Sequence, residues 1–166
     1  MLSGIITNVA NIALTLSFIV ALVFGIAQVR AAARDRRERL ALEALRNFQS
    51  REFAELMYYI TRTEMPKTRK ELDGRPKEEQ VMFIQFAQQM ESLGLMVAAG
   101  AIDIGLVDRT LGSLVSTAWE KYQPMFMDMR KNAPDPYLAE YFQWLAEKID
   151  SQLRDNPREP FYRSGR

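Results

Sequence analysis

The distribution of hydrophobic and charged positions changes sharply at Arg30. From Ile5 to Val29 the chain has no charged residue. As an α-helix this stretch measures roughly 37 Å at 1.5 Å per residue, which is enough to cross a hydrocarbon core of about 30 Å. The sequence therefore predicts one transmembrane helix, and we assign residues 1–29 to a signal anchor.

A cleaved signal peptide is the alternative to an anchor. Such peptides begin with a positive region and have an apolar core of about 7–15 residues. Here no Lys or Arg precedes the apolar stretch and the stretch is longer, although Ala31-Ala32-Ala33 resembles a small-residue cleavage site. The pattern favours an anchor that stays in the mature protein.

Five arginines follow the apolar stretch at one end only: Arg30, Arg34, Arg36, Arg37 and Arg39. Lys and Arg beside a span are retained on the cytoplasmic side, so we expect the N-terminus outside and the C-terminal domain in the cytoplasm. The same cations suit anionic lipid headgroups. Nucleic acid is the other polyanion to consider, but the closeness of the arginines to the bilayer favours lipid, and we expect no nucleic-acid partner.

Small residues recur at every fourth position of the predicted span, at Ala13, Ser17, Ala21 and Gly25. Such a ridge lets a second helix approach closely, and close packing replaces the hydrophobic effect as the source of association inside lipid. Asn8 and Asn11 lie on another face, where a polar side chain is costly unless it is hydrogen-bonded. This favours a partner helix, in a larger membrane complex or a homo-oligomer. The alternative is that small residues are simply common in spans and that both asparagines lie among the headgroups.

Helical periodicity continues through the rest of the chain, and no stretch has the alternation of a β-strand. We therefore predict an all-α protein with three further parts. They are a basic juxtamembrane helix over residues 30–47, a cytoplasmic bundle of about four or five helices over 48–153, and an extended basic tail over 154–166.

Caps and breakers set the expected helix boundaries in the bundle. Helices should begin after Ser50, at Pro76, after Asp103 and at Pro136, where Asp135 is the expected cap. Gly94 is expected to end a helix, because glycine accepts the left-handed conformation at that position. Pro124 should kink or split the helix expected from about Ile104 to Arg130.

Composition removes most catalytic chemistry. The chain has no cysteine and no histidine, so it offers no thiolate nucleophile, Cys/His metal site or His-based triad of its own. Asp103 and Asp108 could form a carboxylate pair or a cation site, but their spacing is not that of an EF-hand loop. Helix capping by Asp103 and a solvated Asp108 explain them better. We expect no cofactor and no metal.

Aromatic and methionine residues near Pro124 are candidates for contact with another protein: Met125, Phe126, Met127 and Met129. The three methionines alternate along the chain, so at least one should face solvent or a partner, and methionine adapts to irregular surfaces. Burial in the core or between helices is the alternative for the aromatic side chains.

Several segments of the chain resemble a known family. They are RNFQSREFAELMYYI, MESLGLMVAAGAIDIGLVDRTLG, WEKYQPMF and DPYLAEYFQWLAEKI, which together cover roughly residues 40 to 150. These segments resemble bacterial proteins grouped as domain of unknown function 4760. The resemblance implies a small helical domain behind one N-terminal span and carries no established activity.

We therefore expect a non-enzymatic, single-pass protein of the bacterial inner membrane that acts as an accessory or tethering subunit of a membrane complex. The first alternative is a membrane-tethered regulator or defence-type effector that senses a ligand or partner and oligomerises. An enzyme built on carboxylates ranks third, since it needs two buried carboxylates that converge on one pocket.

Overall fold

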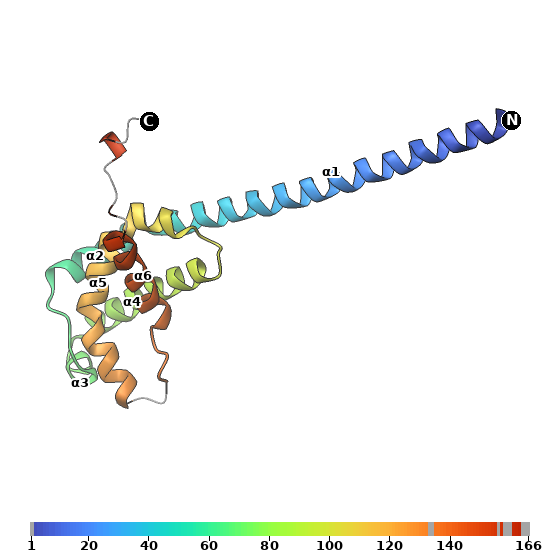
Figure 1. Ribbon diagram of the computed structural model, residues 1–166. Coiled ribbons are helices and arrows are strands. Elements are labelled where there is room, and N and C mark those ends of the chain that lie inside the picture. The colour runs from blue at the N-terminus through green and yellow to red at the C-terminus, as the bar shows by residue number, and fades with distance from the viewer. Residues whose placement is uncertain (1, 133–134, 156, 158–160, 164–166) are drawn as a thin grey trace. The chain divides into compact units, whose positions relative to one another are not determined.

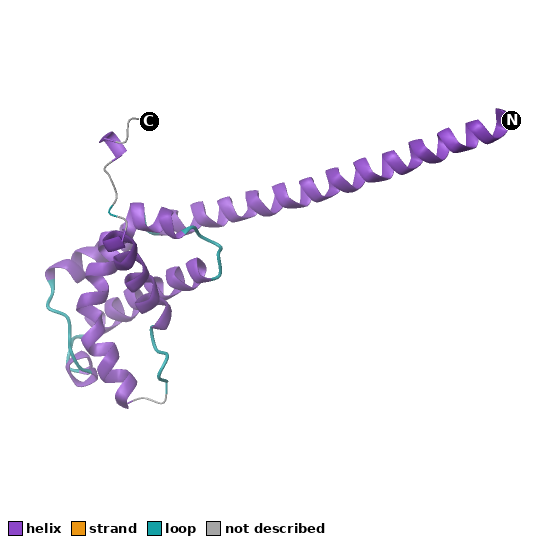
Figure 2. Ribbon diagram, viewed as in Figure 1, coloured by secondary structure: helices purple, strands orange, loops and turns teal. Residues whose placement is uncertain are grey.

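The computed structural model describes residues 2–132, 135–155, 157 and 161–163 of the 166-residue chain. These residues form six α-helices and one short 3₁₀-helix, without a strand among them (Figures 1 and 2). The helices are α1 (Leu2–Asn47), α2 (Arg51–Arg62), α3 (Arg69–Asp73), α4 (Lys77–Ala98), α5 (Ile104–Asn132), α6 (Glu140–Asp155) and η1 (Phe161–Arg163). The all-α prediction is confirmed.

The chain divides into two compact units, residues 1–39 and 40–166. The first unit consists of α1 up to Arg39. α1 itself is unbroken to Asn47, as predicted, because neither proline nor glycine interrupts its sequence after Gly25.

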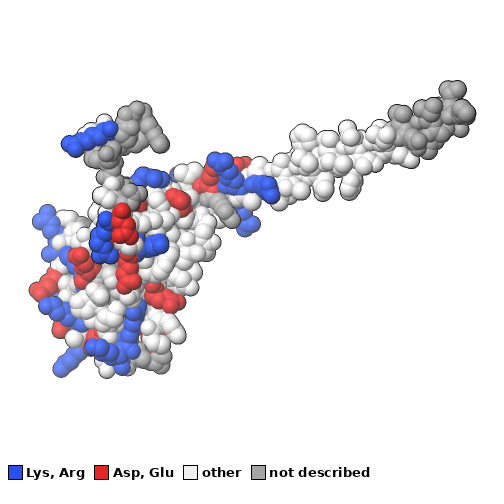
Figure 3. Space-filling view, in the orientation of Figure 1, with Lys and Arg blue, Asp and Glu red and all other residues white. Residues whose placement is uncertain are grey.

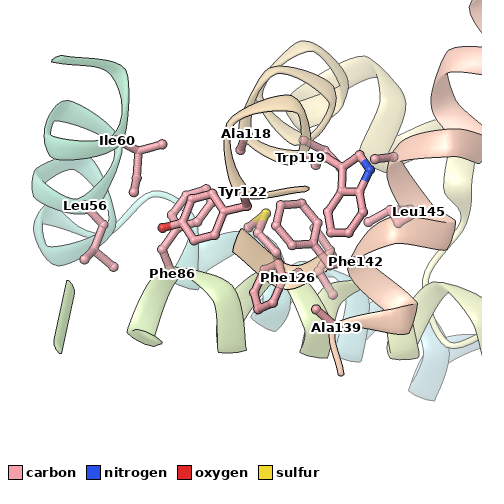
Figure 4. Packing of buried hydrophobic residues seen from close by; sticks show 14 of the residues in the cluster. Leu56, Ile60, Phe86, Ala118, Trp119, Tyr122, Phe126, Ala139, Phe142 and Leu145 are labelled. Atoms are coloured by element: carbon pink, nitrogen blue, oxygen red, sulfur yellow. The ribbon is translucent and has the colours of Figure 1, made fainter. Parts of the chain in front are cut away.

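The second unit is a helical bundle with its own hydrophobic core. α4 and α5 both pack against α6, and α2 packs against α4. Aromatic rings fill the centre: the Phe83 and Tyr122 ring centroids lie 4.2 Å apart, and those of Trp119 and Phe142 lie 5.1 Å apart. Figure 4 shows Tyr122 next to Phe86 of α4. Both side chains are fully buried.

Local caps place several helix ends where the sequence predicts them. The Ser50 hydroxyl accepts a hydrogen bond from the Phe53 amide at 3.1 Å, and Asp103 Oδ1 accepts one from the Leu106 amide at 3.0 Å. Pro76 immediately precedes α4, where its missing N–H leaves no donor unsatisfied. These ends depend on residues only a few positions away.

The prediction that Gly94 ends a helix is wrong. Gly94 lies inside α4, which continues to Ala98, and Gly100 takes the left-handed conformation instead, with φ +69°. The reason for the glycine is the packing of α6. A Cβ at position 94 would overlap the carbonyl group of Tyr141, so Gly94 allows α6 to approach the α4 backbone.

The sequence predicts that Pro124 kinks or splits its helix and that the last helix begins at Pro136. α5 is not split at Pro124 and runs as one helix through it, with buried residues before and after the proline. The last helix begins at Glu140 instead of Pro136. Asp135 Oδ1 accepts from the Tyr137 amide at 2.9 Å, which closes a turn, and Ala139 takes a φ of 61° before α6 starts.

Candidate functional sites

The first candidate site is the apolar surface of α1. Every residue from 11 to 29 is exposed, and Phe18 and Phe24 expose 70% and 64% of their surface. Because this unit is a single helix, nothing within it can bury these side chains. Figure 3 shows the uncharged surface of the helix and the charged side chains that begin at its arginines. Among the described residues, α1 is the one helix long and apolar enough to cross a membrane by length and composition.

The small-residue ridge lies open along this helix. Ala13, Ser17, Ala21 and Gly25 are all exposed, and a Cβ added at Gly25 would meet no atom within 4 Å. Asn11 is exposed too, and its backbone carbonyl accepts a hydrogen bond from the Thr15 hydroxyl at 2.8 Å. The side chain of Asn8 lies outside the described residues. The ridge is thus free for a neighbouring helix, and its role stays a prediction.

The arginine cluster occupies the end of the same unit. Arg30, Arg34, Arg36 and Arg39 are exposed, whereas the side chain of Arg37 lies outside the described residues. Arg34 Nε pairs with Glu38 Oε1 at 2.9 Å, one turn further along the helix. With five arginines against Asp35 and Glu38, the stretch from 30 to 39 carries a net charge of +3. Such a cationic end suits an anionic surface.

Two of the four residues predicted to form a docking surface belong to the core. Met125 is fully buried and Phe126 is 4% exposed, while Met127 and Met129 are half-buried. Met125 and Phe126 continue the buried face of α5, which includes Ala118 and Tyr122 at the three- and four-residue spacing of a helix. These two residues face inward because they lie on this buried face. The predicted docking surface is therefore wrong for both of them.

A pocket of about 610 Å³ lies beside that core, between α3, α4 and the C-terminal part of α5. Its apolar lining includes Phe83, Ile84 and Met129. Its polar lining includes Arg69 and Asp73, which form an ion pair at 2.9 Å. Sequence reasoning missed this pocket because its walls come from three separate helices and from the turn before α6.

Two carboxylates of the bundle, Asp103 and Glu91, accept hydrogen bonds at helix N-termini. Asp103 caps α5, as predicted, but the prediction of a solvated Asp108 is wrong: this residue is 7% exposed, beside Gly112. Glu91 of α4 accepts hydrogen bonds from the amides of Phe142 at 2.8 Å and Tyr141 at 3.3 Å. It thereby caps α6 from a neighbouring helix. In the described part of the chain, no group of three or more His, Cys, Asp or Glu side chains is placed to hold a metal ion.

Two tyrosines have altered acidity. Burial raises the pKa of Tyr59 to about 12, and the hydrogen bond that its hydroxyl donates to Glu79 Oε2 at 2.9 Å acts in the same direction. Arg75 pairs with the same Glu79 at 3.1 Å. Burial also raises the pKa of Tyr122 well above its usual value. Its hydroxyl donates to the Phe83 carbonyl at 3.4 Å. Both tyrosines therefore stay neutral and act as structural hydrogen-bond donors.

The apolar side chains of α1 are exposed, and the other helices pack into a separate bundle. Together these two parts define an all-α protein with one candidate membrane span. Comparison of sequences adds the family. The profile described as Domain of unknown function (DUF4760) matches residues 15–149, so the chain belongs to this family. The resemblance inferred from the sequence is confirmed. No curated protein and no solved structure matches the chain.

Proposed function

We propose that this protein is a non-enzymatic accessory subunit that tethers a helical domain to a membrane complex. In this proposal α1 crosses the bacterial inner membrane once, with its N-terminus outside and the bundle in the cytoplasm. The observation that carries the proposal is the exposure of α1: its apolar side chains from Ile12 to Val29 need a hydrophobic environment that a single helix cannot supply.

The charge distribution supports the orientation. Charge is absent from Ile5 to Val29, and the net charge of +3 follows at once on the C-terminal side. A cationic flank of this kind is retained in the cytoplasm and attracts anionic headgroups. The exposed ridge around Ala21 and Gly25 supplies a contact for a helix of another subunit.

The use of carboxylates supports a non-enzymatic role. Asp103 and Glu91 are engaged with backbone amides at helix N-termini, where they stabilise the bundle. A carboxylate that works as a general acid or base must reach a substrate proton. The hydrogen bonds of these two groups are already directed to the fold.

The test is native mass analysis of the protein extracted from its source membrane in mild detergent. Co-migration with other proteins at fixed stoichiometry is expected. A free monomer would contradict the proposal. Ala21→Ile and Gly25→Ile should weaken that association while leaving membrane insertion intact, because a larger side chain blocks close helix packing. Unchanged association in both variants would remove the ridge from the proposal.

Topology is testable because the chain has no cysteine. A single cysteine in the variant Ser3→Cys should react with an impermeant maleimide in intact spheroplasts. The variant Ser113→Cys, at an exposed position of α5, should react only after the membrane is opened. The reverse pattern would contradict the proposed orientation.

The pocket of about 610 Å³ favours one second candidate, a membrane-tethered regulator that binds a small ligand in the bundle. Its volume falls in the usual range of ligand sites, about 300–1,000 Å³. Native mass analysis separates the two functions, because the regulator predicts particles made only of this chain. A small molecule retained by the extracted protein would favour the regulator as well.

A further inference from the structure

The pocket of about 610 Å³ reaches down to the aromatic core of the bundle. Phe83, Met125 and Phe126 line it and are buried. The ring centroids of Phe83 and Phe126 lie 6.1 Å apart, and Phe126 stacks on Trp119 at the same centroid distance. These lining side chains carry no charge and no hydrogen-bonding group. An apolar part of a ligand gains most from this floor, because it leaves water there without losing a polar partner.

The apolar walls suit a ring better than a chain. Met129 lines the pocket as well and is half-buried, so two methionines and two phenylalanines share the lining. Methionine sulfur makes favourable contacts with the edges of aromatic rings. Phenylalanine rings pack edge-to-face or offset against another ring, beyond the gain from area alone. An aromatic ligand therefore makes contacts here that a saturated chain cannot make.

The charged side chains of the lining are already engaged within the protein. Arg69 forms its ion pair with Asp73 at 2.9 Å, and Glu91 accepts the two amide hydrogen bonds at the N-terminus of α6. These three are the charged residues among the described residues that line the pocket. A charged ligand would lose water and meet no opposite charge that is still unpaired, which is strongly unfavourable. The pocket therefore selects uncharged ligands.

Neutral hydrogen-bonding groups remain available on the α4 side. Gln88 and Ser92 line the pocket and are exposed, and their spacing of four residues puts them on one side of the helix. A side-chain amide and a hydroxyl can each donate and accept. They suit one uncharged polar group, such as a hydroxyl, an N–H or a carbonyl. A few polar groups beside an apolar wall orient a ligand in this way.

The turn before α6 forms another part of the wall. Leu138 and Ala139 line the pocket, and Ala139 is buried with a left-handed backbone, at φ 61°. This conformation is unfavourable for alanine, and residues held in it are frequent at ligand sites. Arg130 Nε donates to the Leu138 carbonyl at 2.9 Å and so attaches the turn to α5. The wall is in place without a ligand, and a preformed site costs less ordering on binding.

We propose that the pocket binds an uncharged aromatic molecule, its rings against Phe83 and Phe126 and its single polar group at Gln88 or Ser92. The proposal rests on the second candidate function, the regulator, and gives its ligand a chemical class. All residues of the pocket belong to the bundle unit, so the site does not depend on α1 crossing a membrane.

Two fluorescent probes with the same rings test the selection against charge. N-phenyl-1-naphthylamine is neutral and has one N–H, and 8-anilino-1-naphthalenesulfonate adds one negative charge. In full-length Trp144→Phe protein, Trp119 is the only tryptophan, and it stacks on Phe126 of the pocket. Energy transfer from Trp119 should show saturable binding of one neutral probe per chain and about tenfold weaker binding of the anion. Equal affinities, or no saturable binding of the neutral probe, would overturn the proposal.

Charges introduced at the mouth of the pocket locate the binding. Ile84 lines the pocket and is 48% exposed, so Ile84→Lys and Ile84→Glu should both fold. Each should weaken binding of the neutral probe by about tenfold, because either charge must lose water beside the ligand. The matched controls are Val81→Lys and Val81→Glu, at a residue of α4 that is 50% exposed and lies outside the lining. Unchanged affinity in both Ile84 variants, or equal losses in the controls, would contradict the proposed site.

Filling the pocket provides an independent readout. Ala87→Phe places a ring in the pocket from its half-buried position on α4 and should abolish saturable binding. Ala54→Phe, at an exposed position of α2, should leave binding unchanged. Saturable binding retained in Ala87→Phe would overturn the proposal. Native mass analysis reports assembly separately. Probe binding lost from a protein that still co-migrates with other subunits refutes the ligand alone, and a free monomer that binds the probe refutes the tethering role alone.

Discussion

Phenylalanine occurs in both units of this protein and behaves in opposite ways. Phe18 and Phe24 of α1 are 70% and 64% exposed, whereas Phe86 and Phe142 of the bundle are fully buried. The difference arises from the arrangement of apolar residues. In α1 they occur without charged neighbours for 25 residues, from Ile5 to Val29. In the bundle they form stripes with polar residues between them, and stripes on several helices can cover one another.

This comparison separates two kinds of hydrophobic stabilisation. The bundle gains stability when its own helices remove apolar surface from water. The apolar part of α1 from residue 11 to 29 is exposed, and its surface is available to lipid or to another helix. Substitutions at matched residues in the two units should therefore have unequal effects on the free energy of unfolding of the bundle.

The largest difference is expected for phenylalanine truncation. Phe86→Ala should lower the free energy of unfolding by about 3–5 kcal/mol, because it removes a buried ring and leaves a cavity. Phe18→Ala should change it by less than about 0.5 kcal/mol, as an exposed position in a separate unit. Denaturant unfolding of the full-length protein in detergent, followed by the fluorescence of buried Trp119, measures both. An equal loss of unfolding free energy in the two variants would mean that α1 and the bundle unfold as one unit.

Glycine provides the next comparison. Gly94→Ala should destabilise the bundle by about 1–3 kcal/mol, because the new methyl group overlaps the Tyr141 carbonyl and forces α6 away. Gly25→Ala meets no atom within 4 Å and should leave the bundle unchanged. Thermal unfolding of the two variants side by side gives the difference. A stable Gly94→Ala protein would show that α4 and α6 separate without cost.

A smaller effect is expected at the cap of α6. Glu91→Gln should cost about 1 kcal/mol, because the neutral amide accepts more weakly from the Phe142 and Tyr141 amides and loses the favourable interaction with the helix dipole. The control is Glu120→Gln, at an exposed position of α5. Urea unfolding curves resolve a change of this size. Similar free energies of unfolding for Glu91→Gln and Glu120→Gln would mean that the cap contributes nothing to stability.

The last comparison concerns the pH dependence of stability. The pKa of Tyr59 rises from 10.0 to about 12 on folding, so the neutral form is favoured in the bundle. The resulting stabilisation is complete below pH 10, and it is lost as the pH rises through 12. Stability of the unmodified protein should fall across this window, and less so in Tyr59→Phe. Tyr58→Phe, at a residue 66% exposed, should follow the unmodified protein. Matching profiles for all three proteins would exclude a contribution from Tyr59.

Features that depend on neighbouring residues were predictable from the sequence. Ser50 and Asp103 cap helices through amides three positions away, so their patterns identify the starts of α2 and α5. The length of the apolar stretch identifies α1 as a candidate span, because helix length follows directly from residue number. The family resemblance was also visible in short sequence segments.

Tertiary structure determined the contacts between residues that lie far apart in the sequence. Gly94 resembles a helix end in sequence and proves to be a contact point, because Tyr141 lies against it. The first turn of α6 depends on Glu91, which lies 50 residues before Tyr141 in the chain. In the sequence, Met125 and Phe126 look like part of an adaptable docking surface. In the structure, other helices cover this side of α5 and bury both residues.

The sequence by itself therefore determined the helical class, the uncovered apolar helix and the cationic end beside it. Periodicity, caps and charge act over one or two turns, and one sequence contains all of that information. The pocket between α3, α4 and α5 and the burial of Asp108 exist only after the helices have packed. Burial is a property of the whole bundle, since each side chain is covered by residues that its own sequence neighbours do not specify.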